Sequence, residues 1–457
     1  MKKTCTTFLL ACLMLLGIQN KVHAQISPAL SARLQNTLDS VCNKYKIKGT
    51  SAAVLIPGVG VWKGANGYSH QNTPITTNML LGMGSNTKTH IAALLLIMQE
   101  KGLISLDDSI GKWIQGYPNI SGRITIRQCL NHTSGLHDYM QSDAINDSLL
   151  SKPEKLWTKQ EILRIAKQPN AAPGGAWDYS NTNYIIAGII IEEVLQKSAW
   201  TAMKEWIFTP HQLNNTFNYG ESGSLPVARP WSVVLTGEEL EDMTQSPYLN
   251  SLFSLATTAG SLITTAEDNV WFWHKLCTKQ LFNEQSWKEM TNTVSIGGQH
   301  GYGLGIFRYS RLLNGRTLYT HGGTFFGYIN ENMFDTTSGV AISALTNQDS
   351  LNNNGLVATV INALHKVSIS YQATGLTENT LTSKINCYPN PANDVINLDE
   401  TLEITEVQLM DISGKIVLEA TNQNQLDVSN LPNGLYVLLA NNSKKNKQYQ
   451  QRIVVQH

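Results

Sequence analysis

The sequence is poor in charge, which restricts what it can bind. Asp, Glu, Lys and Arg make up 15% of its 457 residues, and 34 basic side chains balance 34 acidic ones. A chain without a net basic field does not attract nucleic acid or anionic membranes. It also has no apolar run long enough to span a bilayer. We therefore expect a globular protein of two or three domains that binds no nucleic acid.

Cysteine is also scarce. The six cysteines are widely spaced and form no CxxC pair, so neither a disulfide framework nor a cysteine-based zinc site is indicated. Four of them follow the N-terminal segment: Cys42, Cys129, Cys277 and Cys387. We expect these four to be buried thiols in a fold held by its core, although an oxidising compartment would permit disulfides. We expect no metal and no cofactor.

Residues 1–24 have the pattern of a signal peptide. Lys2 and Lys3 form a positive end, residues 8–18 an apolar core, and Val22-His23-Ala24 a small-residue cleavage site. A loose lipoprotein box at residues 9–12 lies inside the apolar core rather than after it, so cleavage before Gln25 is favoured over lipidation. The protein is therefore expected to be exported.

Residues 25–367 predict one α+β domain. Strand-forming runs lie near both of its ends, and the long middle is mostly helical. We expect an antiparallel sheet flanked by an N-terminal and a C-terminal helix, with an all-helical lobe inserted between its strands. The predicted helices are 28–45 and 356–367, and the predicted strands are 50–56, 61–67 (turned at Pro57-Gly58), 318–320, 326–334 and 340–345.

Two further segments follow this domain. Residues 368–383 are polar, rich in threonine and without periodicity, which predicts a linker. Residues 384–457 contain short alternating runs broken by turn signals at 389–391, 413–414 and 432–434. Such spacing is typical of a small β-sandwich.

The first candidate for chemistry is the Ser85-x-x-Lys88 motif at the start of an apolar helix predicted from near Ser85 to Lys101. Residues three apart lie on one helical face, so the amine can reach the hydroxyl. A lysine with a depressed pKa can take the serine proton, and the helix N-terminus favours an oxyanion. A second match, Ser109 with Lys112, contains Gly111 and follows an acidic pair, which indicates a solvated helix start.

Two later segments complete a candidate site. Tyr179 and Asn181 lie between a Gly-rich turn and an apolar helix, where a phenol can relay a proton and an amide can bind a substrate carbonyl. His321-Gly322-Gly323 ends a predicted strand, and glycine there allows substrate to approach the backbone closely. The N–H of Thr324 is the expected second oxyanion donor.

These motifs, in this order, resemble the serine β-lactamase and penicillin-binding-protein superfamily over residues 28–366. The nearest branch comprises class C β-lactamases, D-alanyl-D-alanine carboxypeptidases and family VIII carboxylesterases; LISLDDSIGKWI, ITIRQCLNHTSGL and GYGLGI match it as well. The resemblance implies an acyl-enzyme on Ser85 and a proton-transfer pair of Lys88 and Tyr179. It also implies a substrate contact by Asn181 and an oxyanion hole made by the N–H groups of Ser85 and Thr324. The pattern HTSGLHD could also indicate that His132 and His137 are metal ligands. The resemblance to this family implies instead that both histidines have a structural role.

The third motif departs from the family pattern. Most members carry K-T-G, K-S-G or H-T-G, whereas this chain has His321 and Gly322, which weaken a grip on a substrate carboxylate. We therefore expect a serine hydrolase leaning to esterase or D-amino-acid amidase or peptidase activity on a small ester, amide or peptide. A β-lactamase or D-alanyl-D-alanine carboxypeptidase is the alternative, and a non-catalytic binding protein on the same fold is a second one.

The C-terminal segment resembles the sorting domain of the type IX secretion system through its YPNP, DISGKIV and LPNGLYVL motifs. This resemblance implies recognition by that secretion machinery and export across the outer membrane. The protein would then be secreted or held at the cell surface. We expect a monomer.

Overall fold

The computed structural model describes residues 26–223, 225–233, 239–349, 355–373, 383–411, 416–442 and 447–457. The predicted signal peptide and residues 374–382 of the predicted linker lie outside these ranges. Helix α12 (Leu356–Ala373) extends past Val367, so the linker does not begin at residue 368 as predicted. Across the described ranges, no helix is both long enough and apolar enough to cross a membrane.

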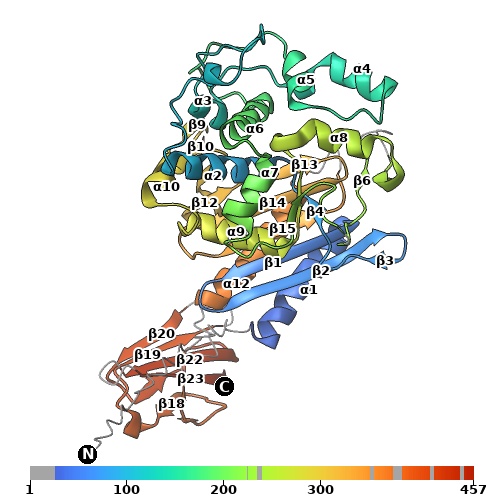
Figure 1. The fold of residues 1–457 in the computed structure, drawn as a ribbon. Helices are drawn as coiled ribbons and strands as arrows, with labels where there is room; N and C mark the ends of the chain where they lie inside the picture. Colours follow the sequence, from blue (N-terminus) through green and yellow to red (C-terminus); the bar gives the residue numbers. More distant parts are fainter. Residues whose placement is uncertain are drawn as a thin grey trace, which may run out of the picture.

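A large antiparallel sheet forms the centre of the first domain (Figure 1). Strands from the two ends of the domain meet in it, with Val54 of β1 opposite Ile342 of β15. The predicted hairpin of β1 and β2, turned at Pro57-Gly58, is confirmed. The strand order is β3-β2-β1-β15-β14-β12-β11-β10-β9, and β13 pairs with β14. The bounds are β1 Gly49–Ile56, β2 Gly60–His70, β3 Thr73–Pro74, β9 Val294–Gly297, β10 His300–Tyr302, β11 Phe307–Arg311, β12 Arg316–Thr320, β13 Gly323–Phe325, β14 Tyr328–Asp335 and β15 Ala341–Thr346.

The first and last helices of this domain cover one face of the sheet, as predicted. Helix α1 (Pro28–Tyr45) begins where the Ser27 hydroxyl accepts from the Leu30 N–H and Pro28 fixes the first turn. It ends at Lys46 in the left-handed conformation. Its apolar stripe packs with α12 against the sheet, which buries Leu34, Leu38, Ile342, Val360 and Leu364 together.

The helical lobe packs against the other face. Its two central helices, α2 (Thr87–Glu100) and α6 (Thr182–Leu195), are apolar nearly all round and therefore buried on most sides. Helix α9 (Ala266–Cys277) lies on strands β1 and β15. The other helices are α3 Ile126–Leu130, α4 Asp143–Ser151, α5 Lys159–Arg164, α7 Ala199–Met203, α8 Tyr248–Ala256, α10 Glu284–Thr291 and α11 Leu312–Gly315. Short strands β4 Leu81–Gly82, β5 Thr216–Asn218 and β8 Leu262–Thr264 pair with one another, as do β6 Trp231–Ser232 and β7 Glu241–Asp242.

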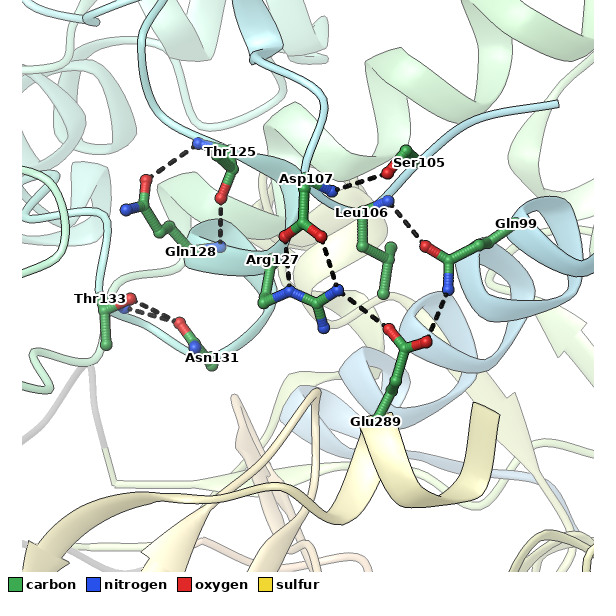
Figure 2. Close-up of polar contacts among 10 residues, drawn as sticks. All are labelled: Gln99, Ser105, Leu106, Asp107, Thr125, Arg127, Gln128, Asn131, Thr133 and Glu289. Atoms are coloured by element: carbon green, nitrogen blue, oxygen red, sulfur yellow. Dashed lines mark hydrogen bonds and ion pairs between the residues drawn. The ribbon is translucent and has the colours of Figure 1, made fainter. Parts of the chain in front are cut away.

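An ion-pair cluster ties α3 to α2 and α10 (Figure 2). The Arg127 guanidinium donates to both carboxylate oxygens of Asp107, at 2.7 and 3.2 Å, and to Glu289 at 2.9 Å. The Gln99 amide donates to Glu289 at 3.2 Å and accepts from the Leu106 N–H at 2.8 Å. Two-pronged Arg–carboxylate pairs are directional, so this cluster holds the segment after α2 against the start of the HTSGL loop.

The C-terminal segment forms a separate β unit with its own core, as predicted. One sheet has the order β16-β23-β22-β19-β20 and the other β17-β18-β21. Their inner faces bury Ile396, Val407, Leu426, Leu438 and Ile453, among others. The bounds are β16 Ser383–Lys384, β17 Cys387–Tyr388, β18 Val395–Leu398, β19 Glu406–Met410, β20 Ile416–Thr421, β21 Gln425–Asp427, β22 Gly434–Asn442 and β23 Lys447–Val455.

The predicted buried thiols are found for three of the four cysteines. Cys42, Cys129 and Cys277 are free and buried, whereas Cys387 is free and partly exposed. Burial raises the pKa of the Cys42 thiol to about 11, so this group remains protonated and unreactive near pH 7.

Candidate active site

Ser85 lies where strand β4 leads into α2. The helix begins at Thr87 rather than near Ser85, which occupies a single 3₁₀ turn, Gly84–Asn86. Gly84 has φ +47°, and a Cβ built on it would lie 2.9 Å from the Thr324 carbonyl oxygen. A glycine is therefore required here, because it allows the short strand β13 to lie directly beside the serine.

Lys88 is fully buried beneath Ser85 and has a partner for each of its three N–H bonds. Its Nζ donates to the Ser85 Oγ at 3.0 Å, to the Asn181 Oδ1 at 2.7 Å and to the Ala259 carbonyl at 2.8 Å. A neutral amine has only two N–H bonds and one lone pair. When Asn181 and Ala259 hold the two N–H bonds, the lone pair is directed at the Ser85 hydroxyl. This geometry suits proton abstraction from the serine.

Burial sets the protonation of Lys88. Its pKa falls from the ordinary value to about 7 because the ammonium is desolvated, and the negative charge of Asp138 partly opposes this fall. The Asp138 carboxylate also accepts from the Asn181 Nδ2 at 2.8 Å and from the Met140 N–H at 3.1 Å. Asp138 therefore orients Asn181. Both the oxygen and the nitrogen of the Asn181 side-chain amide are hydrogen-bonded to other side chains.

Tyr179 lies against the same pair of residues. Lys88 Nζ is 5.0 Å from the centre of its ring, and its hydroxyl bonds to Ser85. Desolvation raises the pKa of Tyr179 well above the ordinary value, and the bond to Ser85 only partly offsets this effect. Tyr179 is therefore a neutral phenol that can donate a proton.

His132 holds the loop that carries Tyr179 and Asn181. Its Nδ1 accepts from the Ser180 N–H and from the Asn183 side chain, both at 3.1 Å. Its ring centre is 4.2 Å from that of Tyr179. Burial lowers the pKa of His132 well below its usual range. These contacts agree with the structural part expected of His132. In the portions of the chain that the structure describes, no three His, Cys, Asp or Glu side chains are grouped so that they could hold a metal ion.

The third motif lies beside the segment that carries Ser85. His321 is 1% exposed; its Nδ1 donates to the Gly322 carbonyl at 2.6 Å, and its Nε2 accepts from the Tyr302 hydroxyl at 3.1 Å. Burial lowers the pKa of His321 to about 3, and the charge of Lys88 contributes to this shift. The imidazole is therefore neutral and supplies no cation for a substrate carboxylate.

Gly323 lies directly against the backbone of the nucleophile segment. A Cβ built on Gly323 would collide with the Met83 carbonyl and lie 2.8 Å from the Ser85 nitrogen. A Cβ on Gly84 would lie 3.1 Å from the Thr324 nitrogen, so the two segments that carry the expected oxyanion donors pack directly against each other.

Three groups at the site escaped sequence analysis. The Ala259 carbonyl left no signal, because any residue supplies one. Asp138 was visible as the acid in HTSGLHD, but its partner Asn181 is 43 residues away. Asn330 of β14 donates to the Met83 carbonyl at 2.7 Å and so ties the sheet to the nucleophile segment.

The second Ser-x-x-Lys match does not form a site. Ser109 is exposed, and the Lys112 amine pairs with Asp108 instead of the serine. The interpretation as a solvated helix start is therefore correct.

A buried lysine bonded to a serine, between an antiparallel sheet and a helical lobe, defines a serine hydrolase of the lysine-activated class. Residues 29–365 match the Beta-lactamase family model, and the chain belongs to that family. Residues 386–456 match the secretion system C-terminal sorting domain. This domain implies that the type IX machinery exports the protein across the outer membrane to the medium or the cell surface.

Named relatives support the same assignment. Penicillin-binding protein 4* of Bacillus subtilis (strain 168) is 31% identical over 193 residues, which cover 41% of this chain and 41% of that relative. The match therefore spans less than half of that relative's own length. Protein flp of Staphylococcus aureus (strain MRSA252) is 24% identical over 387 residues, covering 80% of this chain and 72% of flp.

Two solved structures share the fold over nearly their whole length. A D-stereospecific amidohydrolase from Streptomyces sp. is 29% identical with a TM-score of 0.63, covering 72% of this chain and 97% of that chain. A D-amino acid amidase from Ochrobactrum anthropi SV3 is 25% identical with a TM-score of 0.64, covering 75% and 99%. The predicted α+β fold is thereby confirmed.

Proposed function

We propose that this protein forms an acyl-enzyme on Ser85 and hydrolyses small amides or esters of D-amino acids. The main support for this proposal is the set of three hydrogen bonds that Lys88 Nζ donates. They go to the Ser85 Oγ at 3.0 Å, the Asn181 Oδ1 at 2.7 Å and the Ala259 carbonyl at 2.8 Å. These bonds hold an amine of lowered pKa against the nucleophile, which is what activation of a serine requires.

Each proton in the acylation step has a donor and an acceptor. Neutral Lys88 takes the Ser85 proton while the Oγ attacks the substrate carbonyl carbon. The N–H groups of Ser85 and Thr324 stabilise the oxyanion. As the carbonyl re-forms, the bond to the leaving group breaks, Tyr179 gives that group its proton, and Lys88 reprotonates Tyr179. A water molecule then hydrolyses the ester by the reverse transfers.

The third motif favours substrates without a carboxylate beside it. Neutral His321 brings no positive charge, and Gly322 has no hydroxyl to donate. The similarity to a D-amino acid amidase and a D-stereospecific amidohydrolase supports amides of D-amino acids as the substrate class.

A β-lactamase or D-alanyl-D-alanine carboxypeptidase is the second candidate, because a curated relative is named as a penicillin-binding protein. A non-catalytic binding protein would have no need of the three bonds made by Lys88. We therefore place it last.

A substrate panel tests the proposal. Wild type and Ser85→Ala are assayed for kcat/KM with D- and L-phenylalanine amide, p-nitrophenyl butyrate, nitrocefin and a D-alanyl-D-alanine peptide. We expect D-phenylalanine amide or the ester to exceed nitrocefin and the peptide, and Ser85→Ala to be inactive on all. A wide preference for nitrocefin in the wild type would establish the β-lactamase alternative instead.

A further inference from the structure

The two expected oxyanion donors belong to segments that are far apart in the sequence. Ser85 follows strand β4, whereas Thr324 belongs to strand β13, which pairs with β14. An oxyanion can accept from both N–H groups only while these two segments keep a fixed spacing. A third segment, residues 226–233, is hydrogen-bonded to both of them. We call it the bridging segment.

The bridging segment is a strand partner of the chain that leads to the nucleophile. The Leu80 N–H donates to the Pro226 carbonyl at 2.9 Å, and the Ala228 N–H donates to the Leu80 carbonyl at 2.9 Å. These two bonds form a parallel bridge between Leu80 and Val227. Leu80 directly precedes β4, which leads to Ser85. A shift of the bridging segment would therefore move the backbone that carries the nucleophile.

The same segment lies against the turn between β13 and β14. The Tyr328 hydroxyl donates to the Ala228 carbonyl at 2.7 Å. Gly327 has φ +79°, and a Cβ built on it would collide with the Pro230 side chain. The turn therefore requires glycine, both for its left-handed backbone and for this close approach. Because β13 and β14 pair with each other up to this turn, the turn helps to set the position of Thr324.

Asp349 fastens the bridging segment to this turn. It follows strand β15 and is 4% exposed. Its Oδ2 accepts from the Gly327 N–H and from the Ser232 hydroxyl, both at 2.7 Å, and its Oδ1 accepts from the Val233 N–H at 3.0 Å. One carboxylate thus bonds to the turn and to the C-terminal end of the bridging segment. Hydrogen bonds to a charged acceptor are roughly twice as strong as those between neutral groups, so this contact resists displacement.

We infer that Asp349 is a positioning residue for the oxyanion hole. It fixes the bridging segment on the β13–β14 turn and so keeps the N–H groups of Ser85 and Thr324 at the spacing that an oxyanion needs. This inference rests on the proposed function and deepens it, because it names the group that holds the two donors together. The negative oxygen exists only in the transition state and the tetrahedral intermediate. A wrong spacing therefore lowers kcat and leaves substrate binding nearly unchanged.

The variant Asp349→Asn keeps the shape of the side chain but has one acceptor oxygen fewer. The carboxylate accepts from Gly327 with one oxygen and from Val233 with the other, whereas an amide has a single oxygen. One of these N–H groups must then face an NH2 group. A misplacement of about 1 Å in a catalytic site costs on the order of 100-fold in rate. We expect kcat to fall tenfold or more, with KM within twofold of the wild-type value.

Two measurements separate positioning from loss of stability. The first is kcat and KM for D-phenylalanine amide, because slow acylation by an amide makes KM close to the substrate dissociation constant. The second is the inhibition constant of phenylboronic acid. Its boron accepts the Ser85 Oγ while the serine proton passes to Lys88, which gives a tetrahedral anion that needs the same two donors. We expect Asp349→Asn to weaken this inhibitor by about the factor that it loses in kcat.

Asp335→Asn is the matched control. Asp335 is also a buried carboxylate of this domain, but its side-chain partners are Arg316, Ser338 and His365. We expect this variant to have a lower melting temperature, with kcat and the inhibition constant of phenylboronic acid within twofold of wild type. Equal losses of kcat in Asp335→Asn and Asp349→Asn would overturn the positioning role.

Ser232→Ala is a milder second variant that keeps the carboxylate and removes one of its donors. It should show the same pattern with a smaller loss of kcat, and it tests the inference even if Asp349→Asn does not fold. A loss of kcat without a matching loss of phenylboronic acid binding would contradict the inference. If the wild type shows no Ser85-dependent turnover of any amide or ester, the proposed function fails, and the positioning role fails with it.

Discussion

Lys88 and Glu331 are both desolvated charges near the candidate site, but their surroundings differ. The Lys88 amine has three acceptors within 3.0 Å and a carboxylate, Asp138, in its surroundings. Glu331 accepts a backbone hydrogen bond and lies near the Tyr309 phenol, and no ion pair with it is found among the described residues. The first group is satisfied by three protein acceptors. The second has no such set of partners in the described part of the chain.

This difference bears on the proposed role of Lys88. A base must keep one geometry through the reaction, so its partners are fixed protein atoms. Glu331 instead fills the place that a side chain at Gly322 of the third motif would take. The predictions below change the proposed base and the third motif separately.

Lys88→Met should have the largest effect. It keeps much of the buried volume but removes the base, so we expect kcat/KM to fall by several orders of magnitude on every substrate, as for residues that act as a catalytic unit. Ser109→Ala serves as the control and should be fully active. Near-normal rates in Lys88→Met would mean that another group activates the serine.

The pH profile of the wild type sharpens this prediction. Lys88 must be neutral to act, and its pKa is about 7, so kcat/KM should rise as the pH increases from 6 to 8 and then level off. An N-acetylated substrate is used, because a free α-amine on the substrate would itself titrate close to this range. A flat profile over this range would contradict the assignment of Lys88 as the base.

Asp138→Asn should have an intermediate effect. It loosens Asn181 and removes the negative charge that supports the Lys88 ammonium, so the pKa of Lys88 should fall further. We expect about a tenfold loss of kcat/KM, by the roughly 1–3 kcal/mol cost of a disturbed buried hydrogen bond. The acid limb of the pH profile should move to lower pH. Asp143 is an exposed acid bound to Lys167, and the control variant Asp143→Asn should leave the acid limb of the pH profile unchanged. If the acid limb of Asp138→Asn is also unchanged, Asp138 only supports the structure of the site.

Changes at Gly322 affect selection rather than chemistry. From the sequence, Gly322→Thr should shift preference toward carboxylate substrates. However, the new Cβ would lie 2.5 Å from the Glu331 Oε2 and 2.9 Å from the Asn330 carbonyl. We therefore expect Gly322→Thr alone to destabilise the protein by about 1–3 kcal/mol through overpacking, measured by thermal unfolding.

The double variant Gly322→Thr with Glu331→Ala removes both the side-chain collision and the repelling charge. A hydroxyl that donates to a carboxylate contributes roughly 1.5–3 kcal/mol, so nitrocefin turnover should rise about tenfold relative to Glu331→Ala. Equal nitrocefin rates in the two proteins would show that this position does not contact the carboxylate.

Deletion of residues 384–457 should have no effect on kcat/KM, because the sheets formed by that segment have their own core, separate from the sheet of the first domain. In the native host the truncated protein should remain in the periplasm. Extracellular activity without the segment would refute its sorting role.

Much of the fold was predictable from the sequence. The period of apolar residues defined α1 to the residue, and strand-forming runs near both ends of the domain indicated the shared sheet. The same periodicity did not reveal that α12 continues to Ala373, because polar and small residues there follow the apolar stripe. It also placed the start of α2 too early, because a 3₁₀ turn has no distinct pattern of its own.

The site could be predicted where both interacting residues belong to the same short motif. Ser85 and Lys88 are three residues apart, and their contact follows from helical geometry. The proximity of Glu331 to Gly322 depends on the pairing of β14 with its neighbours after an intervening turn, and one residue of slip would reverse the face of Glu331. Backbone carbonyls such as that of Ala259 cannot be inferred from residue type at all.

The most direct test of the account is to locate the covalent adduct. Wild type and Ser85→Ala are treated with a fluorophosphonate, and the labelled peptide is identified by mass spectrometry. We predict one adduct per wild-type chain, on Ser85, and none in Ser85→Ala at an unchanged melting temperature. An adduct on Ser109, or undiminished labelling of Ser85→Ala, would contradict the assignment of Ser85 as the nucleophile.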